Sequence, residues 1–339
     1  MLDVLTIGRV GVDIYPLQIA TPLAEVERFG RFLGGSPTNV AVAASRQGLR
    51  AGVITRTGAD AFADYVHRAL REYGVDDSQV HPVDGLPTPV TFCEIFPPDH
   101  FPLWFYRTPT APDLQIHADE LDLEAIVAAR VFWLTGTGLC QQPSRAAHGA
   151  ALDARDGRPH TVLDLDYRPM FWPDPATATA AVAEVLPRVT VAVGNLDEVE
   201  VAVGTRDPDR AADLLLARGP RLAVVKLGPA GVLARTGQQS VRVPPVPVEV
   251  VNGLGAGDAF GGALCLGLLR GWPLERTLRF ANAAGAIVAS RLACSAAMPD
   301  YAETAALAET AALAETAALA GDAAPPPAPP TAVLTGEDR

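Results

Sequence analysis

The sequence contains very little lysine and cysteine. Lys226 is the only lysine among 339 residues, so the basic side chains are almost all arginine. The four cysteines lie far apart and form no C-x-x-C pair; they are Cys93, Cys140, Cys265 and Cys294. This spacing argues against a disulfide framework or a zinc site and is typical of reduced thiols in a cytosolic protein.

The chain also lacks the features that direct proteins to membranes or nucleic acids. The N-terminal stretch "MLDVLTIGRVGVD" has no basic region and no long apolar run, which argues against a signal peptide. No stretch reaches the roughly 18 apolar residues of a membrane span. The net charge of −12 argues against nucleic acid as a partner, although residues 301–339, with six acids and one arginine, carry about −5 of it. We therefore expect a globular cytoplasmic protein.

Short apolar segments alternate along the chain with amphipathic ones. The apolar segments include "VLTIG", "VFWLTG", "TVLDLD", "VTVAVGN" and "LAVVKLG", and stretches such as "DAFADYVHRALREYG" lie between them. This alternation predicts a parallel sheet with helices on both faces. Ligands of such sheets bind at the carboxyl ends of the strands. The residues expected at these ends are Asp13, Gly136, Asp164, Asp166, Asn195 and Gly228.

Three segments depart from the alternation. Residues 13–33 and 88–114 carry alternating apolar residues, prolines and aromatics, which predicts strands of a small second sheet that covers the site as a lid. An ordinary β-insertion is the alternative. After residue 300, "AETAAL" occurs three times before a proline-rich stretch, and a period of six does not align its leucines on an α-helix. We expect residues 301–339 to form a low-complexity tail, disordered or partly helical, with no packing partner.

The stretch "NGLGAGDAF" places small residues directly before an acidic one. If the apolar run that follows is a helix, Gly255, Ala256 and Gly257 form a turn whose N–H groups and helix dipole favour an anion. A carboxylate beside a bound anion is unfavourable unless it has a chemical task. Asp258 fits a general base that takes the proton of an attacking hydroxyl beside a phosphoryl group. An Asp that caps a buried helix is the structural alternative.

Two common nucleotide-binding motifs are absent. The chain has no G-x-x-x-x-G-K-[ST] loop, and no G-x-G-x-x-G follows the first strand, which disfavours a nicotinamide-dependent oxidoreductase. Near the N-terminus, "GGSPTNVA" places Gly34 and Gly35 before Asn39. The glycines allow a small ligand to approach the backbone, and Asn39 can both donate and accept hydrogen bonds. Close packing of helix on sheet explains the glycines nearly as well.

Together, "GGSPTNVA" and the distant "GLGAGDAF" resemble the paired signatures of the ribokinase-like (PfkB) sugar kinases. The resemblance covers about residues 1–300 and includes "NLDE" at 195–198 and "KLGPAG" at 226–231. It implies a three-layer α/β/α sandwich with a mainly parallel central sheet and a small β-sheet lid. It also implies transfer of the γ-phosphate of ATP to a sugar hydroxyl with Mg²⁺.

The same resemblance assigns roles to individual residues. Asp258 is the base, and the anion hole is Gly255, Ala256 and Gly257. The sugar side is lined by Asp13, Gly34, Gly35 and Asn39. The nucleotide side is lined by Lys226, Gly228, Gly231 and Asn282. Asn195 and Glu198 organise Mg²⁺ and phosphates through water, although capping of a helix is their structural alternative. The structural alternative for Asn282 is a helix–helix hydrogen bond. The structural alternative for Lys226 is a solvated position at a strand end.

One departure from the family pattern concerns a monovalent cation. Many relatives have Asp-Thr-Thr or a similar triplet just before the Gly-Ala-Gly-Asp turn, and here the residues are Asn252, Gly253 and Leu254. In several relatives that stretch helps to hold the cation. The loss of the Asp charge and of a Thr hydroxyl makes activation by potassium doubtful.

Two arginines indicate an acidic substrate. Arg107 lies on the proposed lid and Arg168 at a strand end, and both match positions where ketodeoxygluconate-type kinases bind the substrate carboxylate. A guanidinium binds a carboxylate in bidentate fashion. Salt bridges with Asp113, Asp164 or Asp166 are the alternative.

Further stretches, "GRVGVDIYP", "LTGTGLCQQPSR", "DLDYRPMFW" and "CSAAMP", resemble the 5-dehydro-2-deoxygluconokinases of inositol breakdown. These kinases phosphorylate the terminal hydroxyl of a keto-deoxy sugar acid, which is the expected activity. A 2-keto-3-deoxygluconate kinase, a fructokinase or ribokinase, and a non-catalytic sugar-acid sensor are the alternatives. The intact "GAGD" argues against the sensor. An exposed lid sheet offers an edge for a homodimer.

Overall fold

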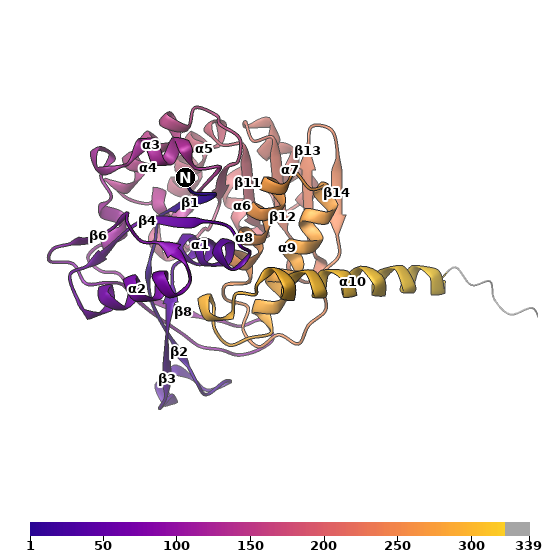
Figure 1. Cartoon of the computed structure of the whole chain (residues 1–339), viewed down its shortest axis with the longest axis horizontal. Coiled ribbons are helices and arrows are strands. Elements are labelled where there is room, and N and C mark those ends of the chain that lie inside the picture. Colours follow the sequence, from indigo (N-terminus) through magenta and orange to yellow (C-terminus); the bar gives the residue numbers. More distant parts are fainter. Residues whose placement is uncertain (323–339) are drawn as a thin grey trace, which may run out of the picture.

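A large sheet forms the centre of the computed structural model, which describes residues 1–322 (Figure 1). Its strand order is β14-β13-β12-β11-β10-β9-β1-β4-β5, with β6 paired to β4. The strands are β1 (Val4–Ile7), β4 (Ala51–Gly58), β5 (Val75–Asp76), β6 (Val80–Val83), β9 (Val131–Thr135), β10 (Thr161–Asp164), β11 (Val191–Asn195), β12 (Leu222–Lys226), β13 (Val232–Thr236) and β14 (Ser240–Val243). Pairing is parallel from β5 to β12, whereas β13 is antiparallel to both of its neighbours.

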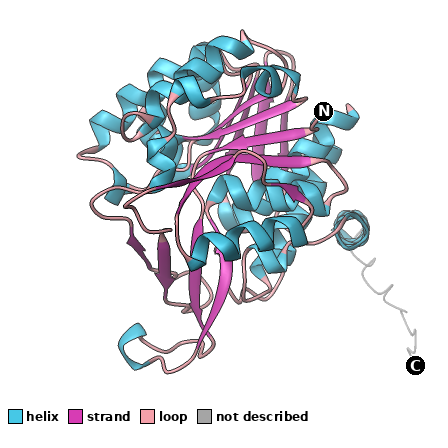
Figure 2. Cartoon of the chain, turned by 60° about the vertical axis from the view of Figure 1, so that its left-hand side comes forward, coloured by secondary structure: helices cyan, strands magenta, loops and turns pink. Residues whose placement is uncertain are grey.

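Helices cover both faces of this sheet, as Figure 2 shows. One face packs against α1 (Ser36–Arg46), α2 (Ala61–Glu72), α8 (Ala256–Arg270) and α9 (Leu274–Ala289). The other face packs against α3 (Leu123–Ala128), α4 (Ser144–Arg155), α5 (Pro175–Val185), α6 (Leu196–Val203) and α7 (Pro208–Ala217). Strand β9 is buried throughout, and its successive side chains enter the two cores in turn: Trp133 packs with the first group and Phe132 with the second. The prediction of a three-layer α/β/α sandwich is confirmed.

A second sheet of four strands projects from this body at the bottom of both views (Figure 1, Figure 2). Its order is β3 (Phe29–Gly34), β2 (Gly11–Pro16), β7 (Val90–Cys93) and β8 (Leu103–Tyr106). Because side chains alternate along a strand, the sheet has two different faces. Asp13, Thr91 and Phe105 share one face and line a cavity against the body, while the neighbouring Phe92, Trp104 and Tyr106 lie on the other. The predicted small sheet is therefore present.

The "AETAAL" repeats form α10 (Tyr301–Asp322), and the expectation that they have no packing partner was wrong. Thr304 is fully buried and accepts a hydrogen bond from Gln47, while Ala305 and Ala308 pack against the first core. Arg279 of α9 forms an ion pair with Glu315. The analysis of the repeats followed the leucines, whereas the contact face is made of threonine and alanines at helical spacing. The proline-rich stretch lies outside the described residues.

Among residues 1–322, no helix combines the length and the apolar character that crossing a membrane requires.

Candidate active site

The candidate site lies where strands of the large sheet end beneath the lid. Since β1, β10, β11 and β12 belong to the parallel part of the sheet, the residues at their carboxyl ends meet along one edge. A cavity of about 60 Å³ lies there, between the lid and the start of α8. Of the predicted residues it is lined by Asp13, Gly35, Asn39, Arg168, Gly255 and Asp258. The two distant signature motifs therefore meet in one cavity.

Asp258 lies in the first turn of α8, where two side chains of α1 hold its carboxylate. Ser36 Oγ donates to Oδ1 at 2.7 Å, and Asn39 Nδ2 donates to Oδ2 at 2.9 Å. Ser295 in turn donates to Asn39 Oδ1 at 2.5 Å, which fixes the orientation of the amide. Burial raises the pKa of Asp258 above its ordinary value of 3.8, and the bonds from Ser36 and Asn39 oppose this rise.

Asp13 of β2 lies on the lid side of the same cavity. Tyr15 donates a hydrogen bond of 3.1 Å to its Oδ2. A side chain at Gly34 would collide with this carboxylate, since an ideal Cβ there would lie 2.1 Å from Asp13 Oδ1. Gly34 is therefore needed for close packing against Asp13. Burial raises the pKa of Asp13 to about 6, despite the opposing Tyr15 bond and the nearby Arg9 charge.

The turn before α8 has the geometry of an anion site. Gly255 caps the helix with φ 84°, and a Cβ there would lie 2.8 Å from Cys294 Sγ, so only glycine fits. The first N–H groups of a helix lack intrahelical acceptors and can bind an anion. A Cβ at Gly257 would lie 3.3 Å from Lys226 Nζ. The single lysine therefore reaches the turn from β12.

A cluster of oxygen-bearing side chains lies beside Lys226. Its Nζ is 3.9 Å from both Asp164 Oδ1 and Glu198 Oε2. Burial alone would lower the pKa of Lys226, but the two carboxylates outweigh it and raise that pKa. Asp164 Oδ1 is buried and has no hydrogen-bond partner. The pKa of Asp164 is raised, chiefly by burial.

Asn195 and Glu198 form the helix cap that the sequence left as the alternative. Asn195 Oδ1 accepts from the Glu198 N–H at 2.9 Å, and Glu198 Oε2 accepts from the Asn195 N–H at 2.7 Å. Glu198 is nonetheless buried beside Lys226. Capping of the helix does not by itself explain why a second buried carboxylate lies near Asp164. Within residues 1–322, no three His, Cys, Asp or Glu side chains converge to hold a metal ion by themselves.

The oxygen atoms of this cluster suit Mg²⁺, which prefers oxygen ligands and keeps several waters. The orphaned Asp164 Oδ1 is an acceptor without a donor, as expected for a carboxylate that faces a cation or its water shell. The residues present therefore fit a hydrated Mg²⁺.

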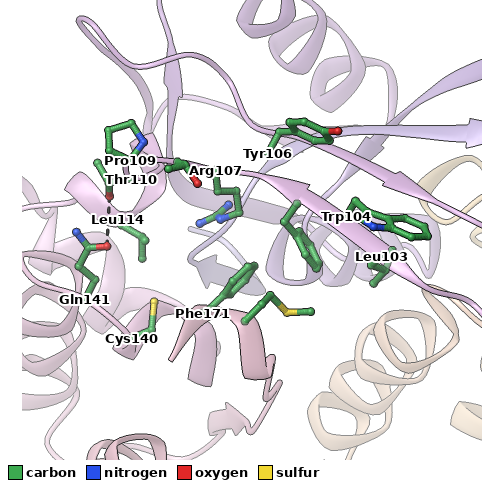
Figure 3. A pocket seen from close by; sticks show the side chains of 13 residues that line it. Leu103, Trp104, Tyr106, Arg107, Pro109, Thr110, Leu114, Cys140, Gln141 and Phe171 are labelled. Atoms are coloured by element: carbon green, nitrogen blue, oxygen red, sulfur yellow. Dashed lines mark hydrogen bonds between the residues drawn. The ribbon is translucent and has the colours of Figure 1, made fainter. Parts of the chain in front are cut away.

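The two predicted arginines lie in different cavities. Arg168 lines the small cavity with Asp258, and its Nη2 lies 3.0 Å from Asp166 Oδ1. Arg107 lines a neighbouring cavity of about 450 Å³, where Figure 3 shows its guanidinium near Phe171. Both nitrogen ends of Arg107 donate to Asp113, at 3.0 and 2.8 Å, which is the salt bridge left open as its alternative. Phe105 lines both cavities and packs edge-on against Phe171, with ring centroids 4.9 Å apart.

The remaining predicted residues lie in turns and helices. Gly228 and Gly231 form the turn from β12 to β13, both with positive φ. Asn282 of α9 donates to the Pro244 carbonyl at 2.9 Å, a bond to a loop and not to a helix. Asn252 is fully buried, donates to the Leu292 carbonyl at 2.7 Å and accepts from the Leu254 N–H at 3.0 Å.

Several residues in or beside the cavity were not singled out from the sequence. Ser36 lies within the quoted glycine motif, and its position next to Gly35 was a usable signal. Arg9 follows the first strand between two glycines, where an isolated buried charge is unusual, and this too could have been noticed. Tyr15 and Thr137 carried no signal, since each is an ordinary strand-end or turn residue in the sequence.

Comparison with known proteins agrees with this geometry. The family model described as pfkB family carbohydrate kinase matches residues 1–301. The chain belongs to this family. It is 32% identical over 310 residues to a 5-dehydro-2-deoxygluconokinase from Shouchella clausii, covering 90% of this chain and 95% of that protein. It is 34% identical over 310 residues to one from Photobacterium profundum, covering 88% and 92%.

The fold of this pfkB family member also resembles a solved structure. An E. coli ribokinase II candidate in complex with ATP and Mg²⁺ has a TM-score of 0.83 at 23% identity, covering 91% of this chain and 100% of that one. The ribokinase-like fold is thus confirmed.

Proposed function

We propose that this carbohydrate kinase transfers the γ-phosphoryl group of ATP to the terminal hydroxyl of a keto-deoxy sugar acid, 5-dehydro-2-deoxygluconate. The observation that carries the proposal is one cavity that combines the carboxylate of Asp258, the anion-binding turn of α8 and the guanidinium of Arg168. A base beside an anion site suits phosphoryl transfer. The positively charged guanidinium of Arg168 in the same cavity suits an acceptor that carries a carboxylate. The names of the relatives at 32% and 34% identity support this choice of acid.

In the proposed reaction Asp258 takes the proton of the terminal hydroxyl as that oxygen attacks the γ-phosphorus. A bond from the sugar oxygen to phosphorus forms, the bond from phosphorus to the ADP oxygen breaks, and the proton remains on Asp258 until it passes to solvent. Ser36 and Asn39 fix the direction of the carboxylate. Because burial raises the pKa of Asp258, the carboxylate is a stronger base than an exposed aspartate.

The turn of Gly255, Ala256 and Gly257 would hold the charge that develops on the transferred phosphoryl group. Its N–H groups are fixed before the reaction, so no reorganisation is needed in the transition state. Lys226 Nζ is close enough to this turn to contact the same phosphates. On this proposal, Gly228, Gly231 and Asn282 border the rest of the nucleotide.

Asp164, Glu198 and Asn195 would hold the Mg²⁺ that accompanies ATP, through its water ligands. When bound, the ion neutralises phosphate charge and orients the phosphates for in-line transfer. Lys226 balances the two carboxylates while no cation is bound, since its ammonium lies 3.9 Å from each.

The lid would exclude water during transfer. The cavity of about 60 Å³ is smaller than the roughly 300 Å³ at which ordinary ligand pockets begin. On this proposal Phe105 and the lid sheet, which border the cavity, shift outward as the sugar acid enters. Closure over the bound acid then limits hydrolysis of ATP.

The outer face of the lid supports the proposed homodimer. Phe29, Trp104 and Tyr106 are 38%, 40% and 63% exposed, and Phe92 packs between the first and the last. Such a contiguous aromatic face is typical of a protein contact. Light scattering is expected to give the mass of two chains, and Tyr106→Glu to give that of one; a wild-type monomer would contradict this assembly.

The experiment that tests the function is a turnover assay with Mg-ATP and a panel of sugars and sugar acids, with ADP release as the readout. Preferred turnover of 5-dehydro-2-deoxygluconate is the expected result. Preference for 2-keto-3-deoxygluconate would mean that the assigned substrate is wrong, but that the substrate is still a sugar acid. Turnover of fructose or ribose alone would show that the arginine side chains do not serve to bind a substrate carboxylate. Binding of a sugar acid without any turnover would favour a sensor.

A further inference from the structure

One buried carboxylate behind the cavity holds two guanidiniums that line it. Asp166 Oδ2 accepts from Arg9 Nη2 at 2.9 Å, and Asp166 Oδ1 lies 3.0 Å from Arg168 Nη2. Thr137 Oγ1 donates to Asp166 Oδ2 at 2.9 Å and accepts from Arg9 Nε at 3.2 Å. Asp166 also has a φ of 29°, a conformation that non-glycine residues rarely adopt. The backbone thus accepts strain to hold this carboxylate between the two arginines.

The charges of this group do not balance. Arg9, Arg168 and Asp166 sum to one positive charge, and the two acidic oxygens are already engaged. In the neighbouring cavity, Arg107 and Asp113 form a bidentate pair whose charges cancel. Asp13 and Asp258 line the same cavity and attract Arg9 through space, but Asp166 is its one ion-pair partner among the described residues. The two arginines share the single carboxylate of Asp166, so the carboxylate of a substrate would supply a second ion-pair partner there, whereas at Arg107 it would compete with Asp113.

Donor groups also remain for a ligand. Arg168 Nε is buried and has no acceptor. A guanidinium has five N–H donors, and the bonds of Arg9 to Thr137 and Asp166 use two of them. Arg9 lines the same cavity as Asp258, with its guanidinium carbon 5.9 Å from the ring centroids of both Phe105 and Phe171. These rings shield it from solvent and thereby strengthen its attraction for an anion.

We propose that Arg9 is the second guanidinium that recognises the acidic end of the substrate, acting with Arg168 as one unit held by Asp166. Arg107 instead ties the end of the lid strand β8 to Asp113. The proposal rests on the proposed function, since it assumes that the acceptor is a sugar acid. It deepens that function by naming the residue that selects for the charge.

The test compares the acid with its primary amide, which has nearly the same shape and no charge. The selectivity of the enzyme is the ratio of kcat/KM for the acid to kcat/KM for the amide, with saturating Mg-ATP. For Arg9→Gln we expect KM for the acid to rise about 10- to 100-fold and KM for the amide to change little, so that the selectivity falls by a similar factor. A residue that only supports the fold would lower turnover of both substrates and leave their ratio unchanged.

Two further variants locate the effect. Arg107→Gln is expected to reduce the selectivity by a much smaller factor than Arg9→Gln, because Arg107 is already paired with Asp113. Arg31→Gln is the control: Arg31 stacks on Tyr65 at 3.8 Å, away from the cavity lining, and its loss should leave both substrates unchanged. If Arg9→Gln does not fold, as judged by circular dichroism, Arg9→Lys takes its place; it keeps the charge, loses the planar fork, and should lose about 3- to 10-fold of the selectivity.

The outcomes separate this proposal from the proposed function. An unchanged selectivity in Arg9→Gln and Arg9→Lys, or a larger loss in Arg107→Gln, would overturn the role of Arg9. If the wild-type protein prefers another sugar acid, the assigned substrate fails, and the variants are measured with that acid and its amide. If the wild-type protein phosphorylates only neutral sugars, both fail.

Discussion

Burial favours the neutral form of each carboxylate in and beside the cavity, and the partners of each decide the net pKa shift. It raises the pKa values of Asp13 and Asp258, whose neighbours donate neutral hydrogen bonds. It also acts on Asp166, but the charges of Arg9 and Arg168 outweigh it and lower that pKa. The pKa of Asp13 is about 6 and that of Asp258 also lies above its ordinary value, while Asp166 stays ionised. The residues thus divide into proton-handling and charge-holding groups.

Replacement of Asp258, the proposed base, tests the first group. Asp258→Asn should lower kcat about 100- to 10,000-fold with little change in KM, because the amide keeps the shape and loses the basic oxygen. In the wild-type protein, kcat/KM should fall as pH drops through the raised pKa of Asp258, so the acid limb should lie above pH 3.8. Initial rates of ADP release across a pH series measure both. A variant that keeps most of its turnover would rule out Asp258 as the base.

Asp13 should reduce stability near neutral pH. Its pKa is about 6 in the folded protein against 3.8 for an ordinary Asp, so the folded state binds the proton more tightly. The contribution of Asp13 to the free energy of unfolding is therefore most favourable below pH 3.8, where its carboxyl is protonated, and this contribution is lost as pH rises through 6. We expect Asp13→Asn, which stays neutral, to raise the free energy of unfolding at pH 7.5 by about 3 kcal/mol.

The check on Asp13→Asn is urea unfolding of both proteins at pH 7.5 and pH 4.5. The difference between them should shrink at the lower pH, while binding of the sugar acid should weaken at both. An equal difference at the two pH values would show that the effect does not come from the ionisation of Asp13.

At the scale of elements, the loop before α8 is held without a cation. The Asn252 amide donates to the Leu292 carbonyl and accepts from the Leu254 N–H, so its donor and its acceptor are both engaged. We expect exchange of Na⁺ for K⁺ at constant ionic strength to change kcat less than twofold. Asn252→Asp, which restores a carboxylate, is the matched variant and should become more responsive to K⁺. Strong activation of the wild-type enzyme by K⁺ would contradict this account.

Helix α10 allows a paired test of its contact face. Ala308 packs against the first core, whereas Leu313 is 72% exposed. Ala308→Glu should lower the free energy of unfolding by about 1–3 kcal/mol, and Leu313→Glu should change it by less than about 0.5 kcal/mol. Thermal unfolding followed by circular dichroism gives both values. Equal effects would mean that the helix does not dock through its alanines.

At the scale of the whole molecule, much of the fold was predictable. Apolar segments such as that of β9 are buried on both faces, and this requirement is visible in the sequence as a continuous apolar run. The lid strands were equally visible, because their residues alternate. The docking of α10 could not be predicted, because alanine is as common in exposed helices as in packed ones. Only a contact in space, such as the hydrogen bond between Thr304 and Gln47, shows which face of the helix packs against the body.

The site was predictable where a local motif carries it. The turn before Asp258 and the glycines before Asn39 are short stretches with a chemical meaning. Arg9 and Asp166 are 157 positions apart, and no local pattern relates them. The partner of Arg107 could not be chosen for the same reason: Asp113, Asp164 and Asp166 were equal candidates until the lid was placed in space.

The scarcity of lysine gives the molecule an unusual chemical property. An amine-directed reagent has a single side-chain target in this chain, Lys226, whose side chain is 19% exposed. The raised pKa of that amine slows acylation, and bound phosphates would block it further. If the nucleotide binds beside Lys226 as proposed, mass spectrometry of one labelled peptide would report its occupancy without any engineered probe.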